Sequence, residues 1–290
     1  MSKVAFITAI LGNYDTMCQP FVKQTVNTDF ICFTDNPNIE SNGWIIDTNS
    51  YWKTHPSKVD TGIYINSTNK VPALTQNSVA QELQGNQHTF NLAKYYKQSW
   101  INIPRLAEYD VVIWIDGTIE IIAPNVSEYM LELCAKYHIV SWHHEYRGGN
   151  LKWEVEASNL PRYHNNHHLG QFQPYQCVYR QYHDYIAQGY DESFWSRVER
   201  KEGRGRGDHF GMWLTCFVAC SNKAERVKDF LDLWYLQTLK YSTQDQVGFP
   251  KVVQDTRLIP YTLPDKVLPG DEPHERCSAF IKHRHRDPTL

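Results

Sequence analysis

The sequence lacks the short motifs that mark several common enzyme classes. No GxGxxG follows its first apolar run, so the usual dinucleotide-binding fingerprint is absent. No GxxxxGK(S/T) is present, which excludes a P-loop kinase, and the absence of GxSxG argues against an α/β-hydrolase. The function therefore has to be sought in the polar residues at the ends of its predicted strands.

An excess of basic charge, long apolar runs and closely spaced CxxC cysteines are missing as well. The formal net charge of -3 provides no basic excess, so nucleic acid is not expected as a partner. No run of about 18 apolar residues occurs, so no integral membrane segment is expected. The seven cysteines include no CxxC pair, and the N-terminus turns polar too quickly for a signal peptide. Reduced thiols and a cytoplasmic location are therefore expected.

The most informative stretch that is present is an apolar run at residues 111–115, which ends at Asp116-Gly117 and is followed by a second β-rich run at 119–122. A continuous apolar run predicts a strand buried on both faces, as in a parallel sheet covered by helices. Ligands of such sheets bind beyond the carboxyl ends of the strands. Asp116 is placed there to meet a metal or a sugar hydroxyl, and Gly117 leaves room for a ligand. The alternative is a simple turn between two strands.

The remaining apolar patterns predict a single α/β domain spanning residues 1–290. Strands are predicted at 4–10, 29–36, 44–47, 111–115, 139–142 and 212–219. Helices are predicted at 90–106, 126–137, 176–188 and 224–240. Two polar stretches, 50–87 and 143–168, are predicted to be loops. This order indicates a mostly parallel central sheet flanked by helices, with a nucleotide site at the strand ends.

Polar side chains recur at those strand ends and on the helix before Asp116. Thr8 and Asp35 lie at the ends of the first two predicted strands, and Asp35 can hydrogen-bond a base or a ribose. The alternative for Asp35 is a turn residue. Lys94 and Lys97 lie one helical turn apart and can neutralise a diphosphate, although a solvated helix face is the usual explanation for such lysines.

Several of these segments together resemble one family. The longest are Ala93-Lys94-Tyr95-Tyr96-Lys97, Val112-Ile113-Trp114-Ile115-Asp116-Gly117 and Gln244-Asp245-Gln246-Val247-Gly248-Phe249-Pro250. Shorter ones are Ile7-Thr8-Ala9, Asn13-Tyr14-Asp15 and Phe33-Thr34-Asp35. In order and spacing, across residues 3–255, they resemble a hexosyltransferase family first catalogued as a domain of unknown function. That family is known from plant Golgi proteins of wall polysaccharide synthesis and from microbes.

The resemblance implies a GT-A fold, which is a Rossmann-like nucleotide-sugar transferase fold, and transfer of a sugar from a nucleotide-sugar donor to a glycan or other hydroxyl acceptor. Residues 1–123 would bind the donor and residues 124–290 the acceptor. The implied donor-binding residues are Thr8, Asn13, Tyr14, Asp35, Lys94, Lys97, Asp116 and Gly117. The expected acceptor-binding residues, in a His-rich loop, are His144, Glu145 and Arg147.

Asp116 and Asp245 are the expected catalytic residues. A sugar transferase needs a carboxylate near the anomeric carbon, either to deprotonate the acceptor hydroxyl or to stabilise the sugar cation. Asp245 follows the long helix at 224–240 and precedes a Gly-Phe-Pro sequence that we interpret as a turn. Without the resemblance, Asp245 would serve equally well as the N-cap of a following helix.

The resemblance also raises the possibility of a divalent metal, Mn²⁺ or Mg²⁺. GT-A enzymes generally hold such an ion with an Asp-x-Asp, but this sequence has Asp116-Gly117-Thr118, and a threonine is a poor substitute for a carboxylate. Candidate ligands are Asp116 and a late histidine, His283 or His285, with Glu120 in reach by strand parity. The alternative for the histidines is a solvated basic tail.

Two other functions stay open at this point. The change from a second acid to Thr118 suits a carbohydrate-binding protein on a degenerate transferase scaffold, without turnover. A nucleotidyltransferase uses a similar sheet, but it normally has a basic residue in the loop after the first strand, and residues 11–15 lack one. Fold alone does not decide among these functions.

Overall fold

The protein is built around a seven-stranded sheet in the order β3-β2-β1-β4-β7-β6-β8. The computed structural model describes residues 2–12, 14–54, 89–144, 147, 149–159, 178–202, 211–263, 267–269 and 275–283. Strand β7 pairs antiparallel with both of its neighbours, and the other four pairs of the sheet are parallel. The strands are β1 (Val4–Ile10), β2 (Thr28–Thr34), β3 (Ile45–Asp47), β4 (Val111–Ile115), β6 (Ile139–His143), β7 (Trp213–Ser221) and β8 (Tyr261–Leu263).

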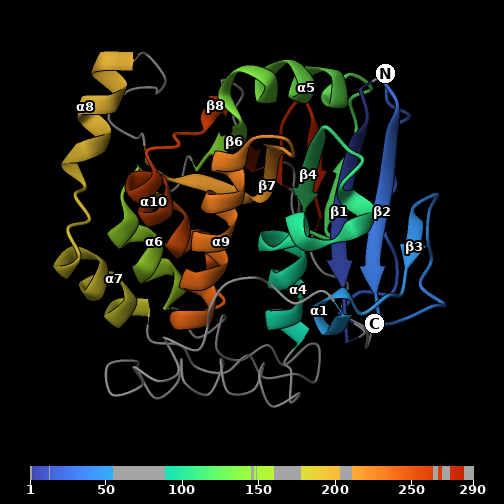
Figure 1. The fold of residues 1–290 in the computed structure, drawn as a ribbon, viewed down its shortest axis with the longest axis horizontal. Coiled ribbons are helices and arrows are strands. Elements are labelled where there is room, and N and C mark those ends of the chain that lie inside the picture. Colours follow the sequence, from blue (N-terminus) through green and yellow to red (C-terminus); the bar gives the residue numbers. More distant parts are fainter. Residues whose placement is uncertain are drawn as a thin grey trace.

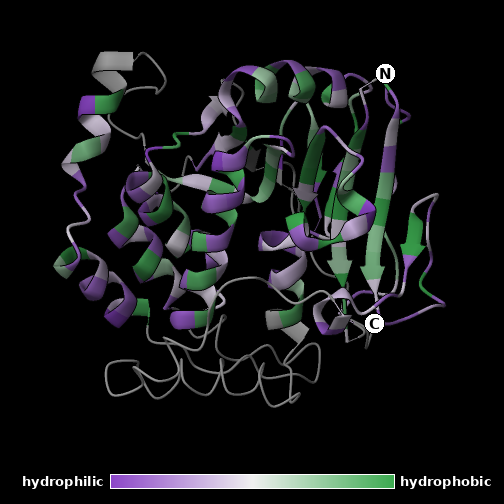
Figure 2. Ribbon diagram, viewed as in Figure 1, coloured by the Kyte–Doolittle hydropathy of each residue, from purple (hydrophilic) through white to green (hydrophobic). Residues whose placement is uncertain are grey.

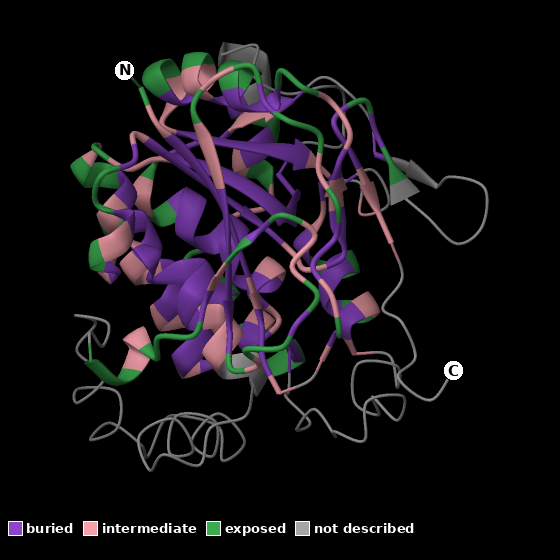
Figure 3. Ribbon diagram, turned by 90° about the vertical axis from the view of Figure 1, so that its right-hand side faces the viewer, coloured by how far each residue is buried: buried purple, intermediate pink, exposed green. Residues whose placement is uncertain are grey.

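The central strands are buried on both faces, as their continuous apolar runs predict. All five residues of β4 are buried. Val112 and Trp114 belong to the core on one face, and Val111 and Ile113 to the core on the other, because successive side chains of a strand point to opposite faces. Figure 2 shows the apolar character of these strands, and Figure 3 shows that they are enclosed while exposed residues lie on the outer helices.

One face of the sheet is covered by a layer of helices. Helix α9 packs against both α4 and α10, and α10 contacts α6 and α7. Figure 1 shows these helices and α8 on the side of the sheet away from β3. They are α4 (Thr89–Gln98), α6 (Leu151–Ser158), α7 (Val178–Ala187), α8 (Ser193–Glu202), α9 (Glu225–Lys240) and α10 (Asp245–Thr256). Short helices complete the connections: α1 (Tyr51–Thr54), η2 (Trp100–Asn102) and η3 (Pro104–Leu106).

The opposite face is covered by α5 (Val126–Tyr137) and by a small second sheet in the order β5-β11-β10-β9. Phe280 connects the two sheets, because its ring stacks on Phe217 of β7 and meets Trp142 of β6 edge to face. The strands of the small sheet are β5 (Ile119–Ile121), β9 (Leu268–Pro269), β10 (Glu275–Arg276) and β11 (Phe280–Lys282). The pairing of β11 with β5 brings residues 280–282 beside the strand that follows the turn at Asp116.

The predicted fold class, an α/β domain with a mixed, mostly parallel sheet flanked by helices, is confirmed. Within the described parts of the chain, none of the helices combines the length and apolar character that crossing a bilayer requires. The six cysteines that are described are all buried, and none of them is in a disulfide.

Three local predictions are wrong. The predicted loop at 143–168 contains α6, whose Leu151 and Val155 pack into the core at helical spacing. The predicted helix at 90–106 ends at Gln98 and continues as two 3₁₀ turns, the second of which starts at Pro104. The Gly-Phe-Pro sequence expected to be a turn lies inside α10. There Gly248 allows close packing on α9, since a Cβ at that position would lie 3.2 Å from Cβ of Gln237.

Candidate active site

A cavity lies at the carboxyl ends of the neighbouring strands β1 and β4. The chain passes from β1 to β2 and β3 on one side of β1, while β4 lies on its other side, and ligands of open α/β sheets bind at such a switch point. The residues that line the cavity come from the ends of these two strands and from α4. They are Ala9, Ile10, Leu11, Tyr14, Asp15, Ala93, Lys94, Trp114, Asp116 and Gly117.

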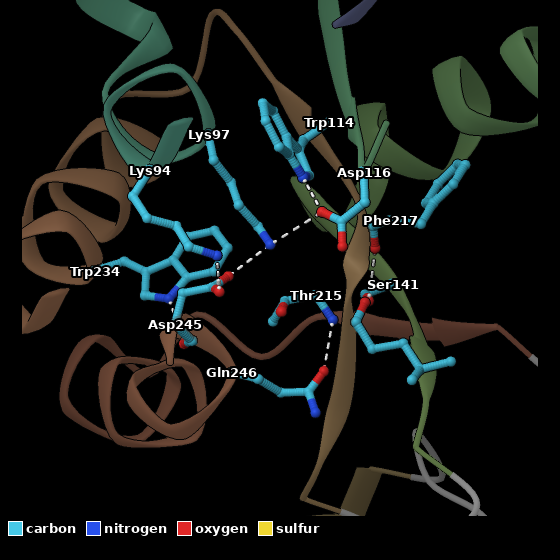
Figure 4. A network of polar contacts seen from close by, with 11 residues as sticks. Lys94, Lys97, Trp114, Asp116, Ser141, Thr215, Phe217, Trp234, Asp245 and Gln246 are labelled. Atoms are coloured by element: carbon cyan, nitrogen blue, oxygen red, sulfur yellow. Dashed lines mark hydrogen bonds and ion pairs between the residues drawn. The ribbon is translucent and has the colours of Figure 1, made fainter. Parts of the chain in front are cut away.

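Next to this cavity, two lysines and two aspartates form a connected set of ion pairs, which we call the charged network (Figure 4). Lys94 on α4 donates to Oδ1 of Asp245, at the start of α10. Nζ of Lys97 lies 2.6 Å from Oδ2 of Asp245 and 3.5 Å from Oδ1 of Asp116. The indole nitrogen of Trp114 donates to the same oxygen of Asp116 at 2.8 Å. The formal charges of the four ionised groups cancel.

The members of the charged network differ in exposure. The side chains of Lys97 and Asp245 are 2% and 8% exposed, whereas those of Lys94 and Asp116 are 18% and 39% exposed. Lys97 also lies between two indole rings, with Nζ 5.6 Å from the centroid of Trp114 and 5.8 Å from that of Trp234. The solvated helix face that the sequence left open for the lysines therefore does not apply to Lys97.

The two carboxylates of the charged network are held in their ionised forms. Burial by itself would raise the pKa of Asp245, but the charges and hydrogen bonds of Lys94 and Lys97 lower it to about 2. Partial loss of hydration would raise the pKa of Asp116, and the same lysines lower it. Burial lowers the pKa of Lys94, whereas that of Lys97 is raised despite burial, because it faces both aspartates. Lys94 is therefore the less firmly held of the two cations.

Asp245 is placed by the packing of α10 against α9 and β7. It is the first residue of α10, where the helix dipole favours a negative charge. Its carbonyl oxygen accepts a hydrogen bond from the indole of Trp234 on α9 at 2.9 Å. The neighbouring Gln246 accepts a hydrogen bond from the backbone N–H of Thr215 on β7 at 3.2 Å. These contacts bring a residue from the second half of the chain to the lysines of the first.

The other predicted donor-binding residues have different positions. Tyr14 and Gly117 line the cavity. Thr8 is buried within β1 and is not part of the described lining. Asp35 is exposed and accepts the backbone N–H of Gly12 with both carboxylate oxygens, at 3.0 Å each, so it holds the loop that follows β1. Asn13 lies outside the described residues.

The predicted acceptor-binding residues gather around a buried carboxylate that the sequence analysis missed. Arg147 donates through Nε to Oε2 of Glu154 on α6 at 2.7 Å, and Nε2 of His144 lies 3.8 Å from the same oxygen. Burial and the nearby Arg147 lower the pKa of His144 to about 3, so the contact between His144 and Glu154 is not an ion pair at neutral pH. Glu145 lies outside the described residues. Neither His144 nor Arg147 is part of the described cavity lining.

Of the predicted metal ligands, His283 is paired with Glu120. Nε2 of His283 lies 2.6 Å from Oε2 of Glu120, and the backbone N–H of His283 donates to the carbonyl of Thr118 at 2.8 Å. Thr118 itself is buried, with 2% exposure. Within the described ranges, no three His, Cys, Asp or Glu side chains converge to hold a metal ion. His285 lies outside these ranges.

Asp15 and Glu154 are polar residues of these sites that sequence reasoning did not single out. Asp15 lines the cavity, and its Oδ2 would lie 3.8 Å from a Cβ at Gly117, so two carboxylates share the cavity wall. Its position three residues after Gly12, in the loop leaving β1, was a usable signal. Glu154 had a weaker one, an acid between the apolar Leu151 and Val155.

Comparisons with known proteins identify structures of similar arrangement and no family. No family model matches the sequence, and no curated protein matches it. The WbbM bifunctional glycosyltransferase is 13% identical, with 91% of this chain and 39% of that chain covered and a TM-score of 0.40. Mouse xyloside xylosyltransferase 1 is 10% identical, with 90% of this chain and 84% of that chain covered and a TM-score of 0.42.

A third similar structure is core-mannan synthase A from Aspergillus fumigatus in its Mn/GDP form, at 7% identity, with 90% of this chain and 70% of that chain covered and a TM-score of 0.37. The chain thus spans well under half the length of WbbM. These three are proteins that the chain is similar to, and overlaps of this size assign it neither an activity nor a ligand.

Proposed function

We propose that this protein is a glycosyltransferase that moves a sugar from a nucleotide-sugar donor to a hydroxyl of a glycan or similar acceptor. The observation that carries the proposal is the charged network beside the cavity at the ends of β1 and β4. Burying charged groups such as Lys97 and Asp245 is costly, and well-packed apolar residues usually serve stability as well or better. Groups with shifted pKa values in a cleft are therefore candidates for function rather than for folding.

The three longest segments of the family resemblance support the same proposal. Lys94 and Lys97 belong to the first segment, Asp116 to the second and Asp245 to the third. The segments are far apart in the chain, yet their charged residues contact one another directly. A chance likeness in sequence gives no reason for those residues to meet.

The cavity suits the donor, which we assign to residues 1–123, with the acceptor on residues 124–290. Lys94 lines the cavity and can neutralise the diphosphate, whose negative charge grows as it leaves. Asp116 is the most exposed member of the charged network, and its carboxylate can accept hydrogen bonds from the hydroxyls of the donor sugar. Gly117 has no side chain that would fill the space beside Asp15 and Ile10.

In this proposal Asp245 is the base of a direct displacement. The acceptor hydroxyl gives its proton to Asp245 while its oxygen forms a bond to the anomeric carbon. The bond from that carbon to the diphosphate oxygen breaks, and its electron pair leaves with the diphosphate. Asp245 is ionised at neutral pH, as a base must be, because Lys94 and Lys97 lower its pKa. These steps use protein side chains alone.

Donor binding provides the first test. We would measure thermal unfolding with a panel of uridine, guanosine, adenosine and cytidine diphosphate sugars, with and without Mn²⁺. A specific ligand at about 100 times its dissociation constant should stabilise the protein by roughly 2.7 kcal/mol. A ligand-bound structure should place the nucleotide at the ends of β1 and β4, and a nucleotide bound elsewhere would refute the assignment of the site.

The second candidate, a carbohydrate-binding protein without turnover, is favoured by Thr118 at the position of the usual second acid. It predicts binding without chemistry. The two functions are separated by following release of free nucleoside diphosphate from the stabilising donor, with water or an oligosaccharide as acceptor. A transferase releases the diphosphate, and release that depends on Asp116 is the decisive result. A binding protein leaves the donor intact.

A further inference from the structure

Lys94 lies between the cavity and Asp245. Lys94 is part of the cavity lining, whereas Asp245 is not, and the two are joined by an ion pair. Figure 4 shows the ammonium group of Lys94 directed at the carboxylate of Asp245. The Asp245 side chain is only 8% exposed, and Lys94 contacts its carboxylate from the cavity wall, so Lys94 shields Asp245 from a hydroxyl in the cavity.

The two lysines of the charged network are not equivalent. Lys97 contacts both Asp245 and Asp116 and is enclosed by two indole rings, so moving it would uncover two carboxylates at once. Lys94 is more exposed, at 18% against 2%, and faces open space on its cavity side. Lys94 is therefore the cation that can change partner while the rest of the charged network is kept.

The charges of the cavity wall give Lys94 a reason to change partner. The charged side chains that line the cavity are those of Asp15, Asp116 and Lys94. Two of these three are acids, so Lys94 is the cation of the described lining to which an entering diphosphate can bind. Before the donor binds, the charge of Lys94 is already neutralised by Asp245.

We propose that Lys94 exchanges Asp245 for the donor diphosphate, so that donor binding uncovers Asp245 for the acceptor. The inference rests on the proposed function and deepens it, because it makes the donor bind first and the acceptor second. Asp245 then keeps Lys97 as its remaining cation. It stays anionic, but it holds an incoming proton more readily than when both lysines neutralise it.

The exchange is reversible over a catalytic cycle. Asp245 takes the proton of the acceptor hydroxyl, the acceptor oxygen bonds to the anomeric carbon, and the diphosphate leaves with the electron pair of the broken bond. The diphosphate remains paired with Lys94 until it dissociates. Asp245 then releases its proton to solvent, and Lys94 returns to it. In the resting arrangement, Lys94 covers the carboxylate of Asp245 for as long as no donor is bound.

The exchange can be observed on the lysine side chains themselves. In protein labelled with ¹⁵N at lysine Nζ, we would titrate uridine, guanosine, adenosine and cytidine diphosphates and inorganic pyrophosphate, with and without Mg²⁺. The signal lost in Lys94→Met identifies Lys94, and the signal lost in Lys97→Met identifies Lys97. A bound diphosphate should shift the Lys94 signal clearly and leave the Lys97 signal near its original position.

Binding affinity supplies the second measurement. Lys94→Met should weaken binding of the diphosphate at least tenfold, and Lys94→Arg, which keeps the charge, should restore most of it. The matched control is Lys223→Met, because Lys223 is exposed and its Nζ donates to the carbonyl of Ala107 in the turn just before β4, at the opposite end of that strand from Asp116. The control should bind as the unaltered protein does, and circular dichroism should show that all variants fold.

The outcomes separate the exchange from the function on which it rests. If a diphosphate binds, the Lys94 signal does not move and Lys94→Met binds it as tightly as the unaltered protein, the exchange is refuted and the proposed function stands. If the unaltered protein binds none of the diphosphates, both are refuted. If the Lys97 signal moves in place of the Lys94 signal, the roles of the two lysines are reversed and the proposal fails.

Discussion

The second half of the chain contains two buried carboxylates, Asp245 and Glu154, that have similar exposure and opposite pKa shifts. Their side chains are 8% and 7% exposed. Burial favours the protonated form of both, yet the pKa of Asp245 falls to about 2 while that of Glu154 is raised. Asp245 contacts two lysines, whereas Glu154 contacts one arginine and a histidine that is neutral at neutral pH. The number of compensating cations decides the direction of the pKa shift, and the degree of burial does not.

The two carboxylates also differ in what they connect. Asp245 is one contact away from the cavity, through Lys94. Glu154 accepts hydrogen bonds from Arg147, from Ser158 and from Gln246, which is the neighbour of Asp245 in α10. Glu154 therefore holds α6 against the start of α10. We infer that Asp245 takes part in chemistry and that Glu154 supports its position.

The sharpest test of this difference compares Asp245→Asn with Glu154→Gln. Asp245→Asn should lower the turnover number by roughly 10²–10³-fold, as expected when a group acting in the transition state is lost, with little change in donor affinity. Glu154→Gln keeps the hydrogen-bonding shape and should cost far less. Transfer rates and calorimetric donor affinities check both. Asp245 would be a binding residue if its variant weakened donor binding and kept the rate at saturation.

A second test concerns the exposed end of the charged network. Asp116→Ala should lower transfer by roughly a hundredfold or more while the protein stays folded, because this carboxylate faces the cavity and has no apolar packing role. The measurement is transfer rate beside circular dichroism. Near-normal turnover in a folded variant would show that Asp116 is only a turn residue, which is the alternative given in the sequence analysis.

The cations give a test on stability. Lys97→Met leaves one lysine for the buried Asp245 and the partly exposed Asp116, and it should lower the free energy of unfolding by roughly 3–5 kcal/mol. Arg147→Met is the matched change beside Glu154. It should lower the free energy of unfolding by roughly 1–3 kcal/mol, because Glu154 can take up a proton once its cationic partner is removed. Urea unfolding at neutral pH compares them. Equal losses would show that the two carboxylates are held in the same way.

The smallest expected effect is on the pH dependence of stability. The folded-state pKa of Glu154 lies above its ordinary value of 4.5. As pH falls, the folded protein therefore takes up this proton at a higher pH than the unfolded chain does, and the site adds stability as pH falls towards 4.5. Asp245 acts in the opposite direction: its contribution is present above 3.8 and is lost as pH falls towards 2. Glu154→Gln should remove a slope of at most about 1.4 kcal/mol per pH unit above 4.5. Melting curves from pH 4 to 7 check this, and an unchanged slope would contradict it.

The sequence by itself determined the frame of the molecule. The run at 111–115 predicted β4 and its burial on both faces, because a strand between two helical or sheet layers needs apolar side chains on both sides. The helices at 126–137 and 224–240 followed from apolar spacing alone and begin and end within one residue of those bounds. Asp116 was placed correctly at a strand end because its position depends only on where that strand stops.

Tertiary structure alone decided how the polar residues are used. Lys97 is one turn from Lys94 on the same helix, and no local pattern says that one is enclosed by indole rings while the other lines a cavity. Lys94 and its partner Asp245 are 151 residues apart in the chain. Their charge states depend on which cations and carboxylates are brought within a few ångströms of them by packing. Coulomb interactions depend on distance in space, and the distance between two residues along the sequence does not predict it.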